Sequence, residues 1–174
     1  TLDYTEKDWL ALFAEMRSVG IDTVIFQASL WNELGECYYR TDAFRSEYRL
    51  WPVLENLIPA VRSAGMTLFL GGYGSAVGWS ASYAKGLLEE ELRRQLTCIR
   101  ELMAFREGFS GIYFTPETAV GKVRQPDRER FMNELYRRYF SEIKEMLPDK
   151  QCAISPATKY GPEAESETIA GWLS

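Results

Sequence analysis

The chain has 174 residues, of which 46% are hydrophobic, and its 20 Lys and Arg against 25 Asp and Glu give a formal net charge of −5. This length and hydrophobic content predict one globular domain over residues 1–174 with a sizeable core, and they exclude a disordered chain. The acidic balance argues against a nucleic-acid partner, which would need clustered positive charge. No apolar run approaches the roughly 20 residues that span a bilayer. The location of the protein and its oligomeric state stay open.

The chain contains no histidine, which restricts its chemistry. Ser-His-Asp and Cys-His triads are excluded within it, as are most zinc and non-haem iron sites. Cys37, Cys98 and Cys152 match no zinc or redox spacing and are interpreted as core residues. We therefore predict no metal and no cofactor, and we assign any acid–base chemistry to carboxylates, Tyr, Lys or Cys.

In chain order, one unit recurs three times: an amphipathic helical pattern, a glycine, one bulky apolar residue and a short β-rich run. The glycines and the predicted strands are Gly20 with residues 23–26, Gly65 with residues 67–70, and Gly108 with residues 111–114. Each glycine is predicted to end its helix in the left-handed conformation, which glycine adopts at the lowest cost.

A fourth copy of the unit lacks the glycine. Its apolar pattern from Phe131 to Met146 predicts a helix, and residues 152–154 predict the strand that follows. Helix starts are marked as well: Thr5 with Asp8 three residues later has the spacing of a capping box, and Pro126 suits a first helical turn.

Strands that alternate with helices predict parallel pairing through right-handed crossovers. A doubly wound sheet and a (β/α)₈ barrel both satisfy this rule. The barrel is favoured because no Gly-x-Gly-x-x-Gly follows the first strand. Four strands cannot close a barrel of eight. We therefore expect an α/β fold of the TIM-barrel type in which this chain covers about strands 2 to 5, with a compact half-barrel or open sheet as the alternative.

The site of such a barrel lies where the C-terminal ends of the strands meet the loops into the next helices. These loops interleave aromatic rings with carboxylates, amides and hydroxyls. Such a set suits a carbohydrate, since rings pack on the apolar faces of pyranoses and polar groups pair with the hydroxyls. Rings that only pack the loops onto the barrel are the alternative. The predicted substrate-binding residues are Gln27, Trp31, Glu33, Tyr73, Trp79, Tyr113 and Tyr160.

Glu117 is the candidate catalytic residue. It follows a predicted strand and Pro116, which would stop strand pairing just before the mouth. A carboxyl group held there among rings would have a raised pKa and would act as a general acid; an ion-paired loop glutamate is the alternative. Glycoside hydrolysis usually needs a second carboxylate, for which Glu33 and Glu36 are candidates.

Residues 16–27, 64–71 and 111–117 together are similar to the domain of unknown function 4434 family, whose members are glycoside-hydrolase-like TIM barrels. The resemblance implies a strand before Thr1 and further units after Ser174. It also implies that Glu117 follows the fourth barrel strand, where many retaining glycosidases carry their acid/base. Those enzymes often have Asn before this glutamate, whereas Pro116 stands here, and their nucleophile follows a seventh strand without a counterpart in this chain.

The leading hypothesis is a glycoside hydrolase with Glu117 as general acid/base, and we expect the 174-residue chain alone to be inactive. The alternative is a non-catalytic carbohydrate-binding barrel in which Trp31, Tyr73 and Trp79 stack on sugar. A third hypothesis is a lyase or isomerase with Lys159 or Tyr160 as base.

Overall fold

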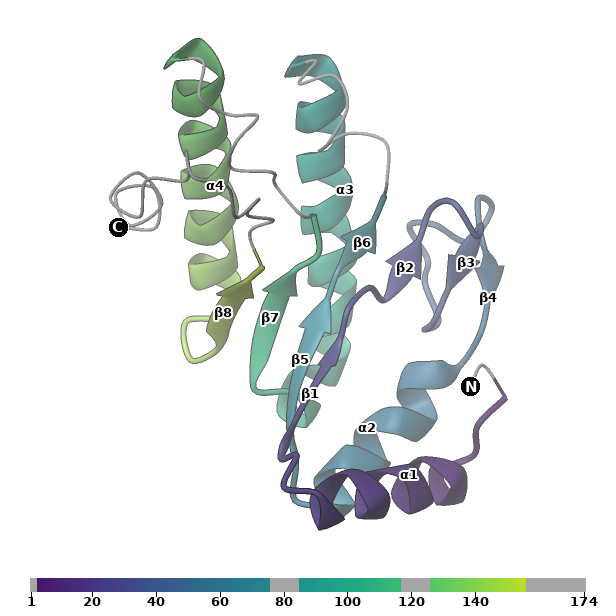
Figure 1. Cartoon of the computed structure of the whole chain (residues 1–174). Coiled ribbons are helices and arrows are strands. Elements are labelled where there is room, and N and C mark those ends of the chain that lie inside the picture. Colours follow the sequence, from purple (N-terminus) through teal and green to yellow (C-terminus); the bar gives the residue numbers. More distant parts are fainter. Residues whose placement is uncertain (1–2, 76–84, 117–125, 156–174) are drawn as a thin grey trace, which may run out of the picture.

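A computed structural model describes residues 3–75, 85–116 and 126–155 of the chain (Figure 1). Helices and parallel strands alternate along it, with short strands and a 3₁₀ segment between them. In chain order the elements are α1 (Glu6–Ser18), β1 (Thr23–Phe26), β2 (Leu30–Trp31), β3 (Glu36–Cys37), β4 (Arg49–Leu50), α2 (Val53–Ser63), β5 (Thr67–Gly71), β6 (Tyr73–Gly74), α3 (Lys85–Leu102), the 3₁₀ helix η1 (Met103–Gly108), β7 (Gly111–Phe114), α4 (Pro126–Met146) and β8 (Gln151–Ile154).

The main sheet has the order β1-β5-β7-β8 and is parallel throughout. The four predicted strands are confirmed at these positions. Each new strand joins the free edge of the one before it, without the reversal of direction that defines a doubly wound sheet. The chain is therefore an α/β protein with a parallel sheet, wound in one direction.

One face of this sheet packs against helices. Successive side chains of a strand point to opposite faces, and on this face Leu70 and Ile112 are at most 1% exposed. Phe114 lies on the same face, and its ring is 4.6 Å from the ring of Tyr139 in α4, measured between ring centroids. Figure 1 shows α3 and α4 side by side behind the sheet. On the opposite face, Ile25 is 51% exposed.

A second, smaller sheet extends the first beyond the C-terminal end of β1. Its order is β4-β3-β2-β6, and β2 pairs with β6 just as β1 pairs with β5 (Figure 1). The sequence pattern predicts only a long loop for residues 28–50. Three two-residue strands lie in that segment, and they are too short to produce a recognisable alternation.

The predicted helix ends are confirmed at three positions. The Thr5 backbone N–H donates to Asp8 Oδ2 at 2.9 Å, and the Asp8 N–H donates to Thr5 Oγ1 at 3.3 Å, which completes the capping box. Gly20 and Gly65 adopt φ values of 86° and 63°, in the left-handed region. None of the described helices is both long and apolar enough to cross a membrane.

The prediction for Gly108 is wrong. The helix α3 continues into η1, and Gly108 does not adopt the left-handed conformation. A Cβ at this position would lie 2.2 Å from Cγ2 of Ile58 in α2. Glycine therefore allows η1 to approach α2 closely, and this tertiary reason leaves no signal in the local sequence.

Substitution of Gly108 by Ala should lower the free energy of unfolding by about 1–3 kcal/mol, because the added methyl group overpacks a filled interface. In urea denaturation, Gly86→Ala is the matched control. Gly86 lies in α3, where an added Cβ would meet no other atom within 4 Å, so alanine there should stabilise the protein by up to about 1 kcal/mol. Equal effects of the two substitutions would contradict the packing explanation.

Candidate functional site

Three strand ends meet at Gly71. The Ser29 hydroxyl donates to the Gly71 carbonyl at 2.7 Å, and the Thr115 hydroxyl donates to the Gln27 carbonyl at 2.9 Å. A Cβ on Gly71 would lie 1.7 Å from the Gln27 carbonyl oxygen and 2.7 Å from Thr115 Oγ1. The segments that follow β1, β5 and β7 therefore converge at the C-terminal edge of the parallel sheet, where α/β proteins bind their ligands.

The small sheet separates its residues into two faces above this edge. Trp31 lies directly between Gly74 of β6 and Glu36 of β3, and Glu36 in turn lies beside Arg49 of β4. These four residues form one row across the sheet, which we call the Trp31 row. The neighbouring row, which points to the other face, consists of Tyr73, Leu30, Cys37 and Leu50.

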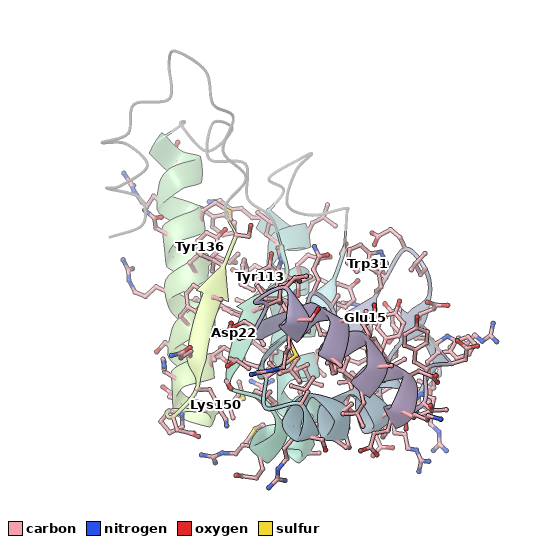
Figure 2. All side chains as sticks on the ribbon, turned by 60° about the horizontal axis from the view of Figure 1, so that its bottom comes forward. Glu15, Asp22, Trp31, Tyr113, Tyr136 and Lys150 are labelled. Atoms are coloured by element: carbon pink, nitrogen blue, oxygen red, sulfur yellow. The ribbon has the colours of Figure 1, made fainter. Side chains whose placement is uncertain are left out.

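Gly74 supports the indole ring of Trp31. A Cβ at position 74 would lie 2.8 Å from Cε3 and 3.1 Å from Cζ3 of that ring, and 2.9 Å from the Ala28 Cβ. The ring therefore rests against the backbone of β6 and remains half-buried. Figure 2 labels Trp31 on the side-chain view of the molecule.

Tyr73 belongs to the buried row and not to the surface. Gln95 of α3 accepts a hydrogen bond from the Tyr73 N–H at 3.1 Å, and its side-chain amide donates to the Tyr73 carbonyl. Burial, followed by the nearby charge of Glu91, raises the pKa of Tyr73 well above its usual value. Only 3% of the residue is exposed. In this structure Tyr73 connects the small sheet to α3, and its contact with a sugar stays a prediction.

Arg94 of α3 fixes the outer part of the small sheet. Its guanidinium contacts Glu47 at 2.9 Å and Glu90 at 3.0 Å, and it donates to the Tyr48 hydroxyl at 3.1 Å. Tyr48 donates in turn to Asn32 Oδ1 at 2.8 Å, next to Trp31. No sequence pattern indicates this network, because Arg94 and its partners Glu47 and Tyr48 are separated by more than forty positions.

Glu101 at the end of α3 holds the segment between β3 and β4. Its carboxylate accepts hydrogen bonds from the hydroxyls of Tyr39 at 3.0 Å and Thr41 at 2.5 Å, and from the N–H groups of Asp42 at 2.8 Å and Ala43 at 2.9 Å. Burial alone would raise the pKa of Glu101, but these hydrogen bonds outweigh burial and hold the pKa below its usual value. Sequence reasoning could not distinguish this residue from other helical glutamates.

The cysteines are confirmed as structural residues where the chain is described. Cys37 and Cys98 are fully buried, and Cys152 is half-buried in β8. Burial raises the pKa of Cys37 to about 11 and also raises the pKa of Cys98. Both thiols are therefore protonated at neutral pH, which makes them poor nucleophiles.

The other predicted site residues within the described ranges lie near the strand ends. Gln27 is exposed and follows β1 directly, while Tyr113 lies in β7 with 6% of its surface exposed. Glu33 is exposed, with Oε1 3.5 Å from the hydroxyl of Ser75. Glu36 accepts from the Tyr38 hydroxyl at 3.0 Å, and burial followed by this carboxylate raises the pKa of Tyr38 to about 12.

Glu117, Trp79 and Tyr160 lie outside the described residues, as does Lys159. The last described residues before Glu117 are Thr115 and Pro116, which follow β7 into the junction at Gly71. Within the described ranges, no group of three or more His, Cys, Asp or Glu side chains could hold a metal ion.

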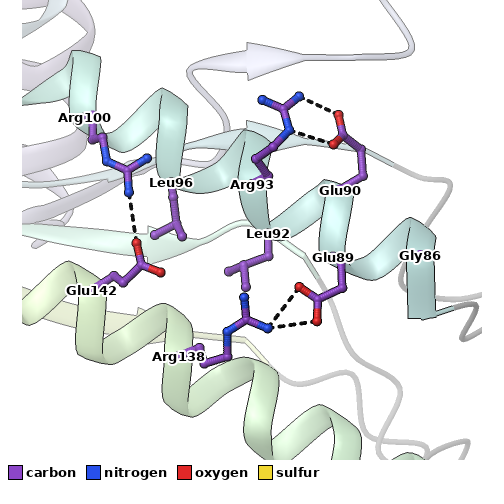
Figure 3. Close-up of a pocket in the computed structure, with 9 residues that line it drawn as sticks. All are labelled: Gly86, Glu89, Glu90, Leu92, Arg93, Leu96, Arg100, Arg138 and Glu142. Atoms are coloured by element: carbon purple, nitrogen blue, oxygen red, sulfur yellow. Dashed lines mark hydrogen bonds and ion pairs between the residues drawn. The ribbon is translucent and has the colours of Figure 1, made fainter.

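Two grooves lie away from this junction. The first, of ≈ 520 Å³, runs between α3 and α4 and is bridged by Arg138–Glu89 at 2.8 Å and Arg100–Glu142 at 2.9 Å (Figure 3). The second, of ≈ 500 Å³, lies between α2 and η1. Ion pairs between exposed side chains such as those of the first groove contribute little to stability. Neither groove contains a predicted site residue.

Sequence comparison identifies the family of the chain. A family model described as "Domain of unknown function (DUF4434)" matches residues 1–171. The chain belongs to the DUF4434 family. Comparison with curated proteins finds no match.

Solved structures similar to this DUF4434 chain come from glycoside hydrolases. One is a Bacteroides thetaiotaomicron protein with a proposed alpha-L-fucosidase activity, with TM-score 0.62, 20% identity, and coverage of 88% of this chain and 46% of that chain. Another is an exo-beta-1,4-mannosidase from Opitutaceae bacterium strain TAV5, with TM-score 0.54, 20% identity, and coverage of 84% and 27%.

A third similar structure is the catalytic domain of the major endoglucanase from Xanthomonas campestris pv. campestris, with TM-score 0.50, 14% identity, and coverage of 91% and 48%. The DUF4434 chain spans less than half the length of each of these three. At such identities the similarity shows the fold alone. That fold is the glycoside-hydrolase-like α/β fold expected from the sequence.

Glu101→Gln should destabilise the DUF4434 chain by about 1–3 kcal/mol at pH 7, because an amide replaces an acceptor of four hydrogen bonds. The folded-state pKa lies below that of the unfolded chain, so the stabilisation is present above about pH 4.3 and is lost as the pH falls through the folded value. Urea denaturation at pH 7 and at acid pH measures both effects.

The matched control is Glu89→Gln, which removes an exposed ion pair to Arg138 on the neighbouring helix α4. It should cost less than about 1 kcal/mol. A Glu101→Gln protein with wild-type stability at pH 7, or with a deficit that grows in acid, would contradict the assigned role of the carboxylate.

Proposed function

We propose that the protein is a glycoside hydrolase in which Glu117 acts as general acid/base at the C-terminal edge of the parallel sheet. The observation that supports this proposal is the hydrogen bond from the Thr115 hydroxyl to the Gln27 carbonyl. Thr115 stands two positions before Glu117, and this bond holds the end of β7 against the segment that follows β1. The bond supports the proposal because it fixes the end of β7 at the edge of the sheet where barrel enzymes perform catalysis.

The position of the strands in a complete barrel is part of the same proposal. We take β1, β5, β7 and β8 as the second to fifth strands of an eight-stranded barrel. The one-directional strand order supports this assignment, as does the similarity to structures that contain more than twice the matched length. Glu117 would then follow the fourth strand.

The chemistry requires two carboxyl groups. In the proposed reaction Glu117 protonates the glycosidic oxygen as the bond to the leaving group breaks. For retention, the second carboxylate would stand about 5 Å away and form a covalent bond to the sugar, and Glu117 would then deprotonate the water that breaks this bond. For inversion, the second carboxylate would stand about 6.5–9.5 Å away and would itself deprotonate the attacking water. Glu33 is exposed near the junction and is a candidate, and a carboxylate from another part of the full protein is the alternative.

The ligand class follows from the surroundings of the junction. Trp31 offers an apolar ring and Glu33 and Gln27 offer polar groups, which together match the mixed character of a pyranose. The similar structures include a mannosidase, an endoglucanase and a protein with a proposed fucosidase activity, so the activities assigned to them all concern glycosides.

Glu117→Gln should lower kcat of the full-length protein about 10²–10⁴-fold on natural oligosaccharides, since that is the usual contribution of general acid–base catalysis. For a dinitrophenyl glycoside kcat/KM should fall much less, because kcat/KM reports the step in which the leaving group departs and this leaving group departs without protonation. Steady-state kinetics on a panel of both substrate types measures the difference.

The control for this experiment is Glu134→Gln, a matched change at an exposed position of α4. It should leave both rates unchanged. Full activity of Glu117→Gln would contradict the assignment. Sugar binding without turnover on any substrate would instead support a non-catalytic carbohydrate-binding barrel.

A further inference from the structure

The small sheet combines a buried face with a face that carries three different kinds of recognition group. Tyr73, Leu30 and Cys37 are at most 3% exposed and belong to the core, whereas Leu50 at the end of their row is 37% exposed. The Trp31 row points to the opposite face, and among its members Trp31 and Glu36 are half-buried while Arg49 is exposed. An aromatic ring, a carboxylate and a guanidinium thus lie on adjacent strands, next to the strand ends where the proposed catalytic site lies.

We propose that the Trp31 row is an oligosaccharide-binding subsite, in which Trp31 stacks on a pyranose ring and Glu36 and Arg49 bind hydroxyl groups of the adjoining sugars. This proposal rests on the proposed function for the class of ligand, and it assigns a separate place and separate residues to binding.

The ring of Trp31 is preset for stacking. Its support by the Gly74 backbone and its position beside Glu36 limit the rotamers open to it. A ring that is ordered before binding loses little conformational entropy when the ligand arrives. Gly74 is therefore a positioning residue, because any larger side chain would displace the ring that it supports.

The polar members are also held in place. Glu36 accepts the hydrogen bond from Tyr38, which leaves further lone pairs of its carboxylate for sugar hydroxyls. Arg49 stacks over the ring of Trp51, with the guanidinium carbon 4.1 Å from the ring centroid. Such stacking orients a guanidinium while its edge keeps its donors.

The dimensions of the row favour a chain of sugars over a single one. From Gly74 to Arg49 the row crosses three strand spacings of about 4.8 Å, roughly 14 Å in all. This exceeds the size of one sugar ring. The two nearby carboxylates of Glu33 and Glu36 outnumber the one guanidinium of Arg49, and their repulsion at close range disfavours an anionic sugar. The fitting ligand is a neutral oligosaccharide.

Isothermal titration calorimetry of the full-length protein tests the subsite with cellotetraose and mannotetraose as neutral probes, tetragalacturonate as the anionic probe, and glucose and mannose as single sugars. At least one neutral tetrasaccharide should bind, and more tightly than its monosaccharide or the uronate. Trp31→Ala should weaken this binding by about ten-fold or more. Leu50→Ala, on the opposite row of the same sheet, is the matched control and should bind as the wild type does.

A double-mutant cycle separates positioning from general loss of structure. Gly74→Ala should weaken binding about ten-fold when Trp31 is present and should have no further effect in Trp31→Ala. Thermal melts check that each variant is folded. Equal effects of Gly74→Ala in both backgrounds, unchanged binding in Trp31→Ala, or no binding of any neutral tetrasaccharide would overturn the subsite.

Glu117→Gln distinguishes the two proposals. It should still bind the tetrasaccharide, whatever happens to turnover. Full turnover in Glu117→Gln together with a loss of binding in Trp31→Ala would refute the catalytic role of Glu117 and support the subsite. Loss of turnover in Glu117→Gln together with wild-type binding in Trp31→Ala would support the catalytic role of Glu117 and refute the subsite.

Discussion

The close approach of three strand ends around Gly71 is the constraint on which the candidate site depends. No side chain larger than hydrogen fits there, because the Gln27 carbonyl and the Thr115 hydroxyl occupy the space of a Cβ. The Gly71 carbonyl accepts hydrogen bonds from both the N–H and the hydroxyl of Ser29, and the Gln27 carbonyl accepts one from Thr115, so these backbone carbonyls at the edge of the sheet are paired. The segments after β1, β5 and β7 consequently start from fixed positions at one edge of the sheet.

The small sheet follows from this junction. Once Ser29 is bonded to Gly71, the chains after β1 and β5 resume their parallel pairing as β2 and β6, and the alternation of side chains assigns Tyr73 to the core and Trp31 to the open face. Hydrogen bonds from α3 then fix this arrangement. Gln95 bonds to Tyr73, Arg94 bonds to Tyr48, and Glu101 bonds to the segment after β3. A helix on the outer layer thus holds the surface on which recognition is proposed.

The strands of the main sheet, the capping box at Thr5 and the left-handed Gly20 and Gly65 could be predicted because their causes are local: apolar runs, capping spacing and backbone conformation. The role of Gly108 could not be predicted, because a close contact between η1 and α2 leaves no local pattern in the sequence. The role of Glu101 could not be predicted either, because its hydrogen-bond donors lie about sixty positions away in the chain. Tyr73 and Trp31 looked equivalent as loop aromatics, and only the register of two-residue strands separates the buried ring from the half-buried one. The catalytic role of Glu117 stays a prediction, since that residue lies outside the described ranges.

Hydrogen–deuterium exchange of the full-length protein, with and without a saturating neutral tetrasaccharide, tests most directly whether the C-terminal edge of the parallel sheet and the small sheet form the carbohydrate site. Binding there should slow the exchange of amides in residues 28–37 and 72–75, because ligand contact reduces local opening in the small sheet and at its junction with the main sheet. The helices α3 and α4 beside the charged groove of Figure 3 should exchange as before. Slower amide exchange only in the helices that line that groove, or only in those that line the groove between α2 and η1, would contradict a carbohydrate site at this edge of the sheet.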